Sequence, residues 1–450
     1  MGKSQFIGGS LVSVLVPVYN VEAYIERCAR SIFDQGYPYL EIVFVDDGCT
    51  DSSISILERV MNEYSHLSEK ISIIHHKQNR GLAAARNTAV DACHGDFVLH
   101  VDSDDWIEPN TIEVLARRQR ETGADLVYTS GFYRHHNECV KEDCHGWSTD
   151  KDCLLTSFLQ DKATISIWSK LIKRSLYTDN KIMSDEGGSY YEDFQVLSRL
   201  IYYSQIITSV DGYLYHYNRA NSNSIVANIP NSVEIQREGL RSIETVCDFF
   251  QDKEQHYLDS VKWFFWHYIH RMIDINSCYG NKEGYEEFMW LLSRLEEQNR
   301  YTSYHITCQI EKPSYAELLG YMRFQIADAF PLLRGEERIK SFTDKLYAHA
   351  KFCLCRDNGY LVGMMAYYAN GKGADFVYLS QAYISPSYRK KGLYNRMLAI
   401  VTNDARERGF HEMRLEVDKE NKTAITCHLS NGFVKIETDT PNSFFMNKAI

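Results

Sequence analysis

Residues 41–53 read EIVFVDDGCTDSS, an apolar run that ends in two aspartates and a small polar turn. Apolar runs of the same kind occur at 11–18, 70–76 and 96–102, and stretches with helical spacing lie between them. Short strands that alternate with helices of this length are typical of a parallel α/β sheet. The pattern predicts such a sheet over about residues 11–225.

The length of the chain predicts more than one domain. It has 450 residues, whereas a single hydrophobic core stops growing at about 250–300 residues. We expect an α/β domain at 1–225, a helical extension at 226–300 and a second α/β domain at 301–450. The last region has helical stretches first, then strands, a glycine-containing turn, a helix and a further strand.

The expected extension contains an aromatic-rich helix, VKWFFWHYIHRMIDI at 261–275. We interpret it as the core of a helical bundle, because no dense Lys/Arg face flanks its apolar residues. The alternative is an interfacial helix that holds the protein at a membrane surface.

Charge and cysteine content exclude some classes of protein. The net charge of −11 argues against a nucleic-acid binder that depends on broad positive charge. The N-terminal apolar run is broken by Pro17 and predicts a buried strand instead of a signal peptide. The twelve cysteines form no CxxC pair and are interpreted as reduced thiols of a cytoplasmic protein. Histidines and cysteines at 135–153 lack the paired spacing of zinc ligands, so we expect a solvated loop there.

Three polar clusters directly follow predicted strands: PVYN at 17–20, DDGCTD at 46–51 and DSDD at 102–105. Ligands of open parallel sheets bind beyond the carboxyl ends of the strands, so these clusters are expected to line one site. Three carboxylates in four residues predict a hard dication, Mn²⁺ or Mg²⁺, that bridges the protein and a diphosphate. The alternative for this cluster alone is a solvated acidic turn.

Five motifs in a fixed order carry a resemblance to a known family. They are SVLVPVYN (13–20), VDDGCTDSS (45–53), NRGLAAARN (79–87), VDSDD (101–105) and YYEDF (190–194). Together they resemble the family-2 glycosyltransferases, which have the GT-A fold, a Rossmann-like and mostly parallel sheet. Cys49 stands where this family usually has a serine.

The resemblance implies a nucleotide-sugar donor, with uridine as the base, and a divalent metal. Pro17, Tyr19 and Asn20 would shape the base pocket. Asp47 would hydrogen-bond the base or the ribose. The remaining contacts implied for the nucleotide-sugar are Arg86, Asp102, Asp104 and Arg219, and those implied for the metal are Asp102, Asp104 and Asp105.

The same resemblance makes Asp193, in the Glu192-Asp193 pair, the general base. An inverting transfer needs a carboxylate to take the proton of the acceptor hydroxyl as its oxygen attacks the anomeric carbon. The metal stabilises the leaving diphosphate. The alternative is an acidic pair at a helix N-terminus, favoured by the macrodipole.

A second constellation lies at 375–433, where a strand, a basic glycine turn and a helix start predict an anion site. Residues 421–433, NKTAITCHLSNGF, follow a further strand. This region resembles the GNAT acetyltransferases over 301–450. The resemblance implies that acetyl-CoA is bound by Ala382, Ile384, Arg389, Lys390, Lys391, Gly392, Leu393, Tyr394 and Asn421.

Two residues depart from the GNAT pattern. Tyr394 stands where a small residue usually lets the backbone approach the pyrophosphate. His428 stands where the family often has a tyrosine that protonates the departing thiolate. An imidazolium is the expected catalytic donor here, and the alternative is a site without a proton donor.

The resemblances imply an inverting, metal-dependent glycosyltransferase of cell-surface polysaccharide assembly that also N-acetylates an amine with acetyl-CoA. Its acceptor would be a carbohydrate or a lipid-linked sugar, and it would bind no nucleic acid. We expect it in the cytoplasm, with the inner face of the membrane as an alternative place of action. The alternative function is a glycosyltransferase whose GNAT-like module only binds or serves as a scaffold. An acetyltransferase with an inert first half is disfavoured by the intact Asp104 and Asp193.

Overall fold

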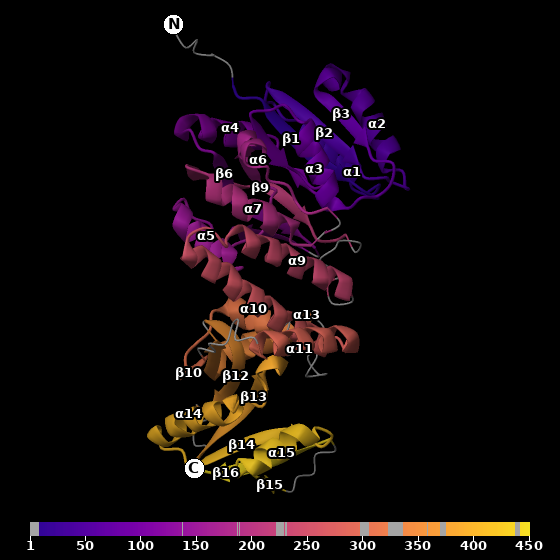
Figure 1. The fold of residues 1–450 in the computed structure, drawn as a ribbon. Coiled ribbons are helices and arrows are strands. Elements are labelled where there is room, and N and C mark those ends of the chain that lie inside the picture. Colours follow the sequence, from indigo (N-terminus) through magenta and orange to yellow (C-terminus); the bar gives the residue numbers. More distant parts are fainter. Residues whose placement is uncertain are drawn as a thin grey trace. The chain divides into compact units, whose positions relative to one another are not determined.

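A computed structural model describes the fold of the chain (Figure 1). The described residues are 9–136, 138–186, 188, 190–221, 229, 232–297, 306–322, 336–357, 359–369, 375–436 and 442–450. They divide into two compact units, 1–268 and 269–450. The domain limits expected near 225 and 300 fall outside the described residues and remain predictions.

The first half of unit 1 is a parallel sheet. Its strands are β1 (Val12–Val18), β2 (Leu40–Asp46), β3 (Ile71–His75) and β4 (Phe97–His100). They lie in the order β3-β2-β1-β4, and all three neighbouring pairs are parallel. Every residue of β1 and β4 is buried, as expected for strands covered on both faces. The parallel α/β fold predicted from the sequence is confirmed for this half.

The sheet continues with strands that run in both directions. These are β8 (Lys170–Lys173), β6 (Leu126–His135), β9 (Ile207–Asn218) and β5 (Trp106–Ile107), with β7 (Cys139–Asp143) paired to β6. β8 is antiparallel to β4 and to β6, whereas β6 and β9 are parallel. β9 is also antiparallel to β5, so its last residues lie beside the chain that leaves β4.

Helices follow most strands of unit 1, as Figure 1 shows in indigo and magenta. Their bounds are α1 (Ile25–Phe33), α2 (Ser53–Glu63), α3 (Leu82–Ala92), α4 (Thr111–Thr122), α5 (Lys151–Leu159), α6 (Arg174–Asn180), α7 (Glu192–Tyr203) and α9 (Val233–Phe249), with a 3₁₀ helix, η1 (Ser65–Lys70). α1 buries Ile25, Cys28, Ala29, Ile32 and Phe33 in the same hydrophobic cluster as β1 and β2. This face has the 3.6-residue period that the sequence predicted.

The division between the units falls inside α10 (Gln255–Cys278). Its aromatic residues are largely buried, and within unit 1 the ring of Phe264 packs on Phe194 at 5.2 Å and on Tyr191 at 5.6 Å. The prediction that this helix forms core is therefore confirmed. Among the described residues, no helix combines the length and the apolar character needed to cross a bilayer.

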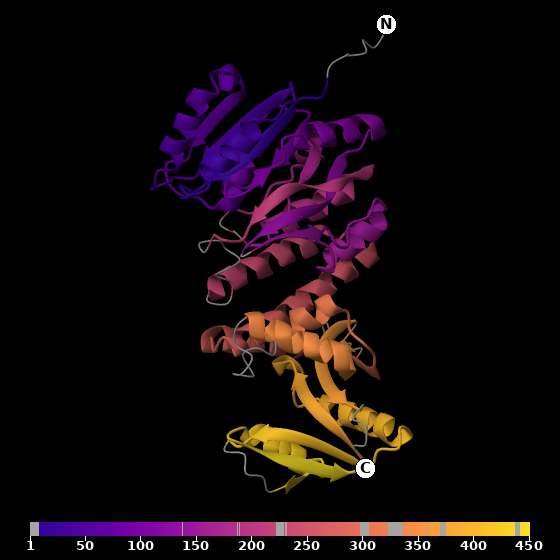
Figure 2. The ribbon, with the colours of Figure 1, turned by 180° about the vertical axis from the view of Figure 1, so that it is seen from behind.

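Unit 2 is built on a seven-stranded sheet, best seen from behind in Figure 2. The strands are β10 (Ile306–Ile310), β11 (Lys351–Asp357), β12 (Tyr360–Tyr368), β13 (Phe376–Ile384), β14 (Glu412–Asp418), β16 (Ser443–Ala449) and β15 (Val434–Ile436), in this spatial order. The other elements are α11 (Lys282–Glu297), α12 (Tyr315–Tyr321), α13 (Glu336–His349), η5 (Pro386–Tyr388), α14 (Leu393–Glu407) and α15 (Lys422–Ser430).

β13 and β14 are the parallel pair of this sheet, and their pairing is partial. It joins Phe376–Leu379 to Glu412–Leu415 and goes no further among the described residues. The rest of β13 pairs on its other side with β12. In the described part of the chain, backbone groups of residues 380–384 therefore have no strand on the β14 side.

One expectation about the cysteines is wrong. Cys308 and Cys355 form a disulfide, because the antiparallel register of β10 and β11 places them directly opposite each other. Cross-strand partners of this kind bring their Cβ atoms within reach of a disulfide. Sequence spacing could not reveal this pair, since 47 residues separate the two positions.

Candidate active sites

The exits of β1, β2 and β4 meet at one edge of the sheet. The backbone N–H of Asp47 donates to the carbonyl of Val18 at 2.9 Å, and that of Thr50 donates to the side chain of Asn20 at 2.8 Å. The thiol of Cys28 donates to the carbonyl of Asp102. The three predicted clusters are thus brought together, as parallel strand order requires.

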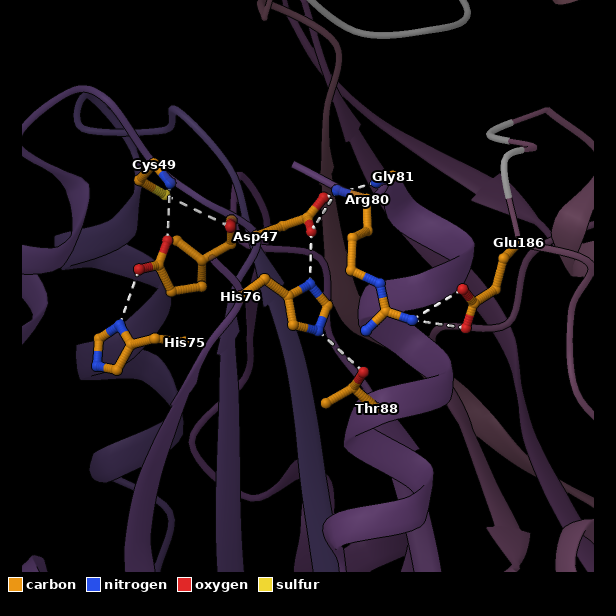
Figure 3. Close-up of polar contacts among 10 residues, drawn as sticks. Asp47, Cys49, His75, His76, Arg80, Gly81, Thr88 and Glu186 are labelled. Atoms are coloured by element: carbon orange, nitrogen blue, oxygen red, sulfur yellow. Dashed lines mark hydrogen bonds and ion pairs between the residues drawn. The ribbon is translucent and has the colours of Figure 1, made fainter. Parts of the chain in front are cut away.

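Asp47 organises the loop that precedes α3 (Figure 3). One carboxylate oxygen accepts from the N–H of Arg80 at 2.9 Å, and the other accepts from that of Gly81 at 2.8 Å. His76 Nδ1 lies 2.6 Å from the first oxygen, and its Nε2 lies 2.9 Å from the Thr88 hydroxyl. Only 2% of Asp47 is exposed. The residue holds the loop before α3 in place, and its role toward a nucleotide stays a prediction.

The residues expected at the base pocket differ in accessibility. Pro17 lies within β1 and is buried, whereas Tyr19 is 46% exposed. Asn20 has a φ of 49°, a conformation that asparagine tolerates better than most residues. Of the three, Tyr19 offers the most surface to a ligand.

Arg86 lies at the centre of the acidic residues. Its Nη2 donates to Asp102 at 2.8 Å, and its Nη1 donates to Glu192 at 2.6 Å and to Asp193. The side chain is 6% exposed. The structure therefore brings Asp102 of the 102–105 cluster and the Glu192-Asp193 pair onto one buried guanidinium.

Glu192 and Asp193 begin α7, after Tyr191 with a left-handed φ of 63°. Asp193 also accepts from the N–H of Ile167 at 2.9 Å. Burial raises the pKa of Asp193, although Arg86 opposes this. Burial and the charge of Asp193 raise the pKa of Glu192 to about 8. At neutral pH Glu192 is mainly protonated, which leaves Asp193 as the better candidate for a base.

Replacing Glu192 with glutamine should flatten the pH dependence of stability. Because the folded-state pKa of Glu192 is raised to about 8 from 4.5, the folded state binds more protons, and stability falls as pH rises between these values. Glutamine mimics the protonated acid and removes this loss. We expect the melting temperature of the variant to decrease less than that of the wild type from pH 6 to pH 9. An equal decrease in both proteins would contradict this assignment.

The acids after β4 have different surroundings. Asp105 is 1% exposed and accepts from the Tyr215 hydroxyl and from the N–H of Asn218, both at 2.7 Å. Burial, together with the charges of Asp104 and Asp102, raises its pKa well above the usual value. Asp104 accepts from Asn221 at 2.8 Å, and burial raises its pKa. Asp102 and Asp104 therefore have more freedom to bind a cation than Asp105.

Metal binding at these acids stays a prediction. In the described part of the chain, the structure gathers no set of three or more His, Cys, Asp or Glu side chains suited to hold a metal by themselves. Crowded carboxylates with raised pKa values nevertheless signal uncompensated negative charge, which a dication would relieve. A metal here would have to complete its shell with ligand oxygens and water.

Arg219 directly follows Asn218, whose backbone N–H donates to Asp105. The side chain of Arg219 is exposed, and its backbone N–H donates to the carbonyl of His135 at 2.7 Å. Lys170 is a residue that sequence reasoning did not place at the site, yet it is fully buried. Its ammonium donates to Ser166 at 3.2 Å and to the carbonyl of Trp168 at 3.1 Å, and burial lowers its pKa to about 8. A lysine is most often exposed, so the sequence gives no signal of such burial.

In unit 2 the basic turn lies between β13 and α14. Arg389, Lys390, Lys391 and Gly392 are all exposed, with a left-handed φ of 60° at Lys390 and of 76° at Gly392. α14 begins at Leu393 directly after this turn. Exposed cations next to a helix N-terminus suit a pyrophosphate.

Two other residues predicted to bind acetyl-CoA lie on β13, the strand that precedes this turn. Ala382 and Ile384 belong to the part of β13 that leaves β14, so their backbone can meet an extended ligand. Asn421 instead caps α15, since its side chain accepts from the N–H of Ala424 at 3.0 Å.

Tyr394 and His428 form a pair. The Tyr394 hydroxyl lies 2.8 Å from Nδ1 of His428. Burial lowers the pKa of His428 to about 4, so its imidazole is neutral at pH 7 and the expected imidazolium donor is not populated. Tyr394, which looked from the sequence like an obstacle to the coenzyme, is the hydrogen-bond partner of this neutral imidazole.

Comparison with known proteins gives two matches to families. Residues 13–165 match the sequence model of glycosyl transferase family 2, and residues 321–433 match that of the acetyltransferase (GNAT) family. The second match, together with the sheet of unit 2, identifies a GNAT domain at the C-terminal end.

Similar proteins agree with the first match. EpsH of Bacillus subtilis, a protein assigned as a glycosyltransferase, is 30% identical over 249 residues, which cover 54% of this chain and 70% of EpsH. TuaG of the same organism, assigned as a glycosyltransferase of teichuronic acid biosynthesis, is 38% identical over 26% of this chain and 46% of TuaG. The crystal structure of S. aureus TarS 1-349 with UDP-GlcNAc is 20% identical, with a TM-score of 0.43 over 68% of this chain and 95% of TarS 1-349.

The sequence relatives, rather than the structural match, decide the family. EpsH is 30% identical, and this chain covers 70% of its length. The chain belongs to glycosyl transferase family 2 and is a glycosyltransferase that also carries a GNAT domain.

Proposed function

We propose that unit 1 transfers a sugar, with inversion, from a nucleotide-sugar to a hydroxyl of a carbohydrate or lipid-linked acceptor. The observation that carries the proposal is the meeting of Asp102 and Asp193 at Arg86. One acid lies at a strand exit, where donors bind in such sheets. The other is a half-buried carboxylate beside it, suited to take a proton from an acceptor.

A divalent cation, Mn²⁺ or Mg²⁺, fits the donor side of this site. Asp102 and Asp104 would hold it, because both oxygens of Asp105 already accept hydrogen bonds. When bound, the cation would stabilise negative charge on the leaving diphosphate. The protein itself would bind the nucleotide through the β1 and β2 exits and keep Asp193 ready for the acceptor proton.

The donor is proposed to be a uridine diphosphate sugar and the pathway to be the synthesis of a cell-surface polysaccharide. The assigned role of TuaG supports the pathway. We place the reaction in the cytoplasm or at the inner face of the membrane, where a lipid-linked acceptor would be reached.

A screen of nucleotide-sugars tests this function. A ligand that binds only the folded state raises the melting temperature, so the cognate donor with Mn²⁺ should stabilise the full chain. Nucleotide-sugars with other bases should stabilise it less. If no nucleotide or nucleotide-sugar shifts the melting temperature, with or without metal, the proposal of sugar transfer is wrong.

A second candidate function, N-acetylation with acetyl-CoA, is favoured by unit 2. Its support is the unpaired β14 side of residues 380–384 together with the basic turn that follows. The pantetheine arm would bind along β13, and the pyrophosphate would bind at the turn. The alternative is a module that binds acetyl-CoA or a partner without turnover.

Tyr394 should be the proton donor to the departing thiolate in that reaction. We expect Tyr394→Phe to lower kcat for acetyl transfer by about 10²-fold, within the range for a general acid, while calorimetry of acetyl-CoA shows a Kd within about threefold of wild type. His428→Asn should have a smaller effect on kcat, because His428 acts only through Tyr394. A Tyr394→Phe variant with wild-type kcat would contradict this role, and absence of heat with the wild type would favour a non-binding scaffold.

A further inference from the structure

One guanidinium serves both acidic motifs of unit 1. Arg86 donates to Asp102 from Nη2 at 2.8 Å, and to Glu192 at 2.6 Å and Asp193 from Nη1. Only 6% of its side chain is exposed, so salt screens these ion pairs far less than pairs at the surface. Because the guanidinium is planar and rigid, it fixes how far the two sides of the site lie from each other.

This geometry leaves little of Arg86 for a nucleotide. Both terminal nitrogens already donate to protein carboxylates. The Nε atom is buried and has no partner among the described residues, and the same holds for Nδ1 of His100. Both residues, with Asp193, line a cavity that offers about 10 Å³ to the centre of a water molecule, which is near the minimum for one water.

Negative charge exceeds positive charge at this point. Three carboxyl groups share the one guanidinium, and the next cation, Lys170, donates elsewhere. A change in how strongly one carboxylate binds Arg86 therefore changes how strongly Arg86 binds the other two. The change in interaction energy caused by this competition is larger in a desolvated site than at the surface, because the effective dielectric constant is lower.

We infer that Arg86 is a positioning residue that couples the donor side of the site to the general base. The inference rests on the proposed sugar transfer. A cation that binds at Asp102 competes with the guanidinium for this carboxylate, and the guanidinium then interacts more strongly with Asp193. Since coupling between two sites is reciprocal, the charge of Asp193 must in turn affect cation binding at Asp102.

A double-mutant cycle on ligand binding tests the coupling without any turnover. Calorimetry measures the binding of UDP with Mn²⁺ to the full-length wild type, Asp193→Asn, Arg86→Gln and the double variant. We expect Asp193→Asn to weaken binding about fivefold to tenfold, because Arg86 then holds Asp102 more strongly. In the Arg86→Gln background the same change should weaken binding less than about twofold.

Asp211→Asn is the matched control, because it removes the same charge from an exposed position of β9. It should leave the affinity unchanged. If Asp193→Asn weakens binding equally with and without Arg86, the effect is mere loss of charge and the coupling is wrong. Should Arg86→Gln fail to fold, Arg86→Lys completes the cycle, since a single ammonium keeps the charge but cannot bridge both sides.

Kinetics separate positioning from nucleotide binding. For Arg86→Lys we expect kcat for transfer to fall about 10²-fold, with the donor KM within about threefold. A raised donor KM with unchanged kcat would assign Arg86 to the nucleotide and overturn the inference. A wild type that binds UDP with Mn²⁺ but shows no coupling refutes only the inference, whereas one that neither binds UDP nor consumes any nucleotide-sugar refutes the proposed function.

Discussion

Replacing Asp193 with asparagine is expected to lower kcat for sugar transfer by about 10²–10⁴-fold, the usual contribution of a general base. Asparagine keeps the shape of the side chain and can still accept from the N–H of Ile167, but it cannot take a proton. Steady-state assays of released nucleoside diphosphate measure the loss. Affinity for UDP with Mn²⁺ should change no more than about tenfold.

Glu192→Gln is the neighbouring control. Glu192 is mainly protonated at neutral pH because burial and Asp193 raise its pKa to about 8, so the amide should retain most of the activity. The assignment of the base would be refuted if Asp193→Asn kept near-wild-type kcat, or if Glu192→Gln were the more damaging change.

Replacing Asp104 with asparagine is expected to abolish metal-dependent use of the donor. The carboxylate is half-buried near Asp102, and its pKa is raised by desolvation. A dication at this place would lose an anionic oxygen ligand in the variant. Titration of UDP in the presence of Mn²⁺ should show a Kd raised by about 10²-fold or more, because the cation that bridges the protein and the diphosphate would lose one of its few protein ligands.

The other unit supplies the control for this variant. Acetyl-CoA should bind Asp104→Asn with the wild-type Kd, since the substitution lies in a different compact unit. Normal UDP and Mn²⁺ binding by the variant would show that the metal is not held by Asp104. Loss of both activities would instead indicate a folding defect.

The periodic parts of the fold could be predicted from the sequence. The apolar runs of β1, β2 and β4 are buried on both faces, and such runs are readable because their length and Val/Ile content are local properties. The strands after β4 are harder, because β8 and β9 insert by long-range pairing that no local pattern encodes. The disulfide between Cys308 and Cys355 could not be predicted for the same reason, because it depends on the long-range pairing of β10 with β11.

The residue types of the site could also be predicted from the sequence, but their hydrogen-bond and ion-pair partners could not. Acidic residues at strand ends predict a shared site by topology alone. That Arg86 would meet Glu192, 106 residues away, depends on how α7 packs against the sheet. Likewise, Asp47 looked like a ligand for a base, yet both of its oxygens accept backbone N–H groups.

His428 illustrates a third limit. A histidine at the position of the family's tyrosine predicts an imidazolium as the proton donor. Protonation of a histidine depends on its burial, however, and burial lowers the pKa of His428 to about 4. The sequence could not supply that number, nor the contact with Tyr394.

A crystal of the full chain soaked with MnCl₂ and UDP tests the central claim most directly. The account predicts an anomalous manganese peak beside Asp104 and the diphosphate, with the uracil at the β1 and β2 exits and the Asp193 carboxylate opening onto the same cleft. Manganese and UDP bound away from these acids, or Asp193 closed off from the bound nucleotide, would contradict it.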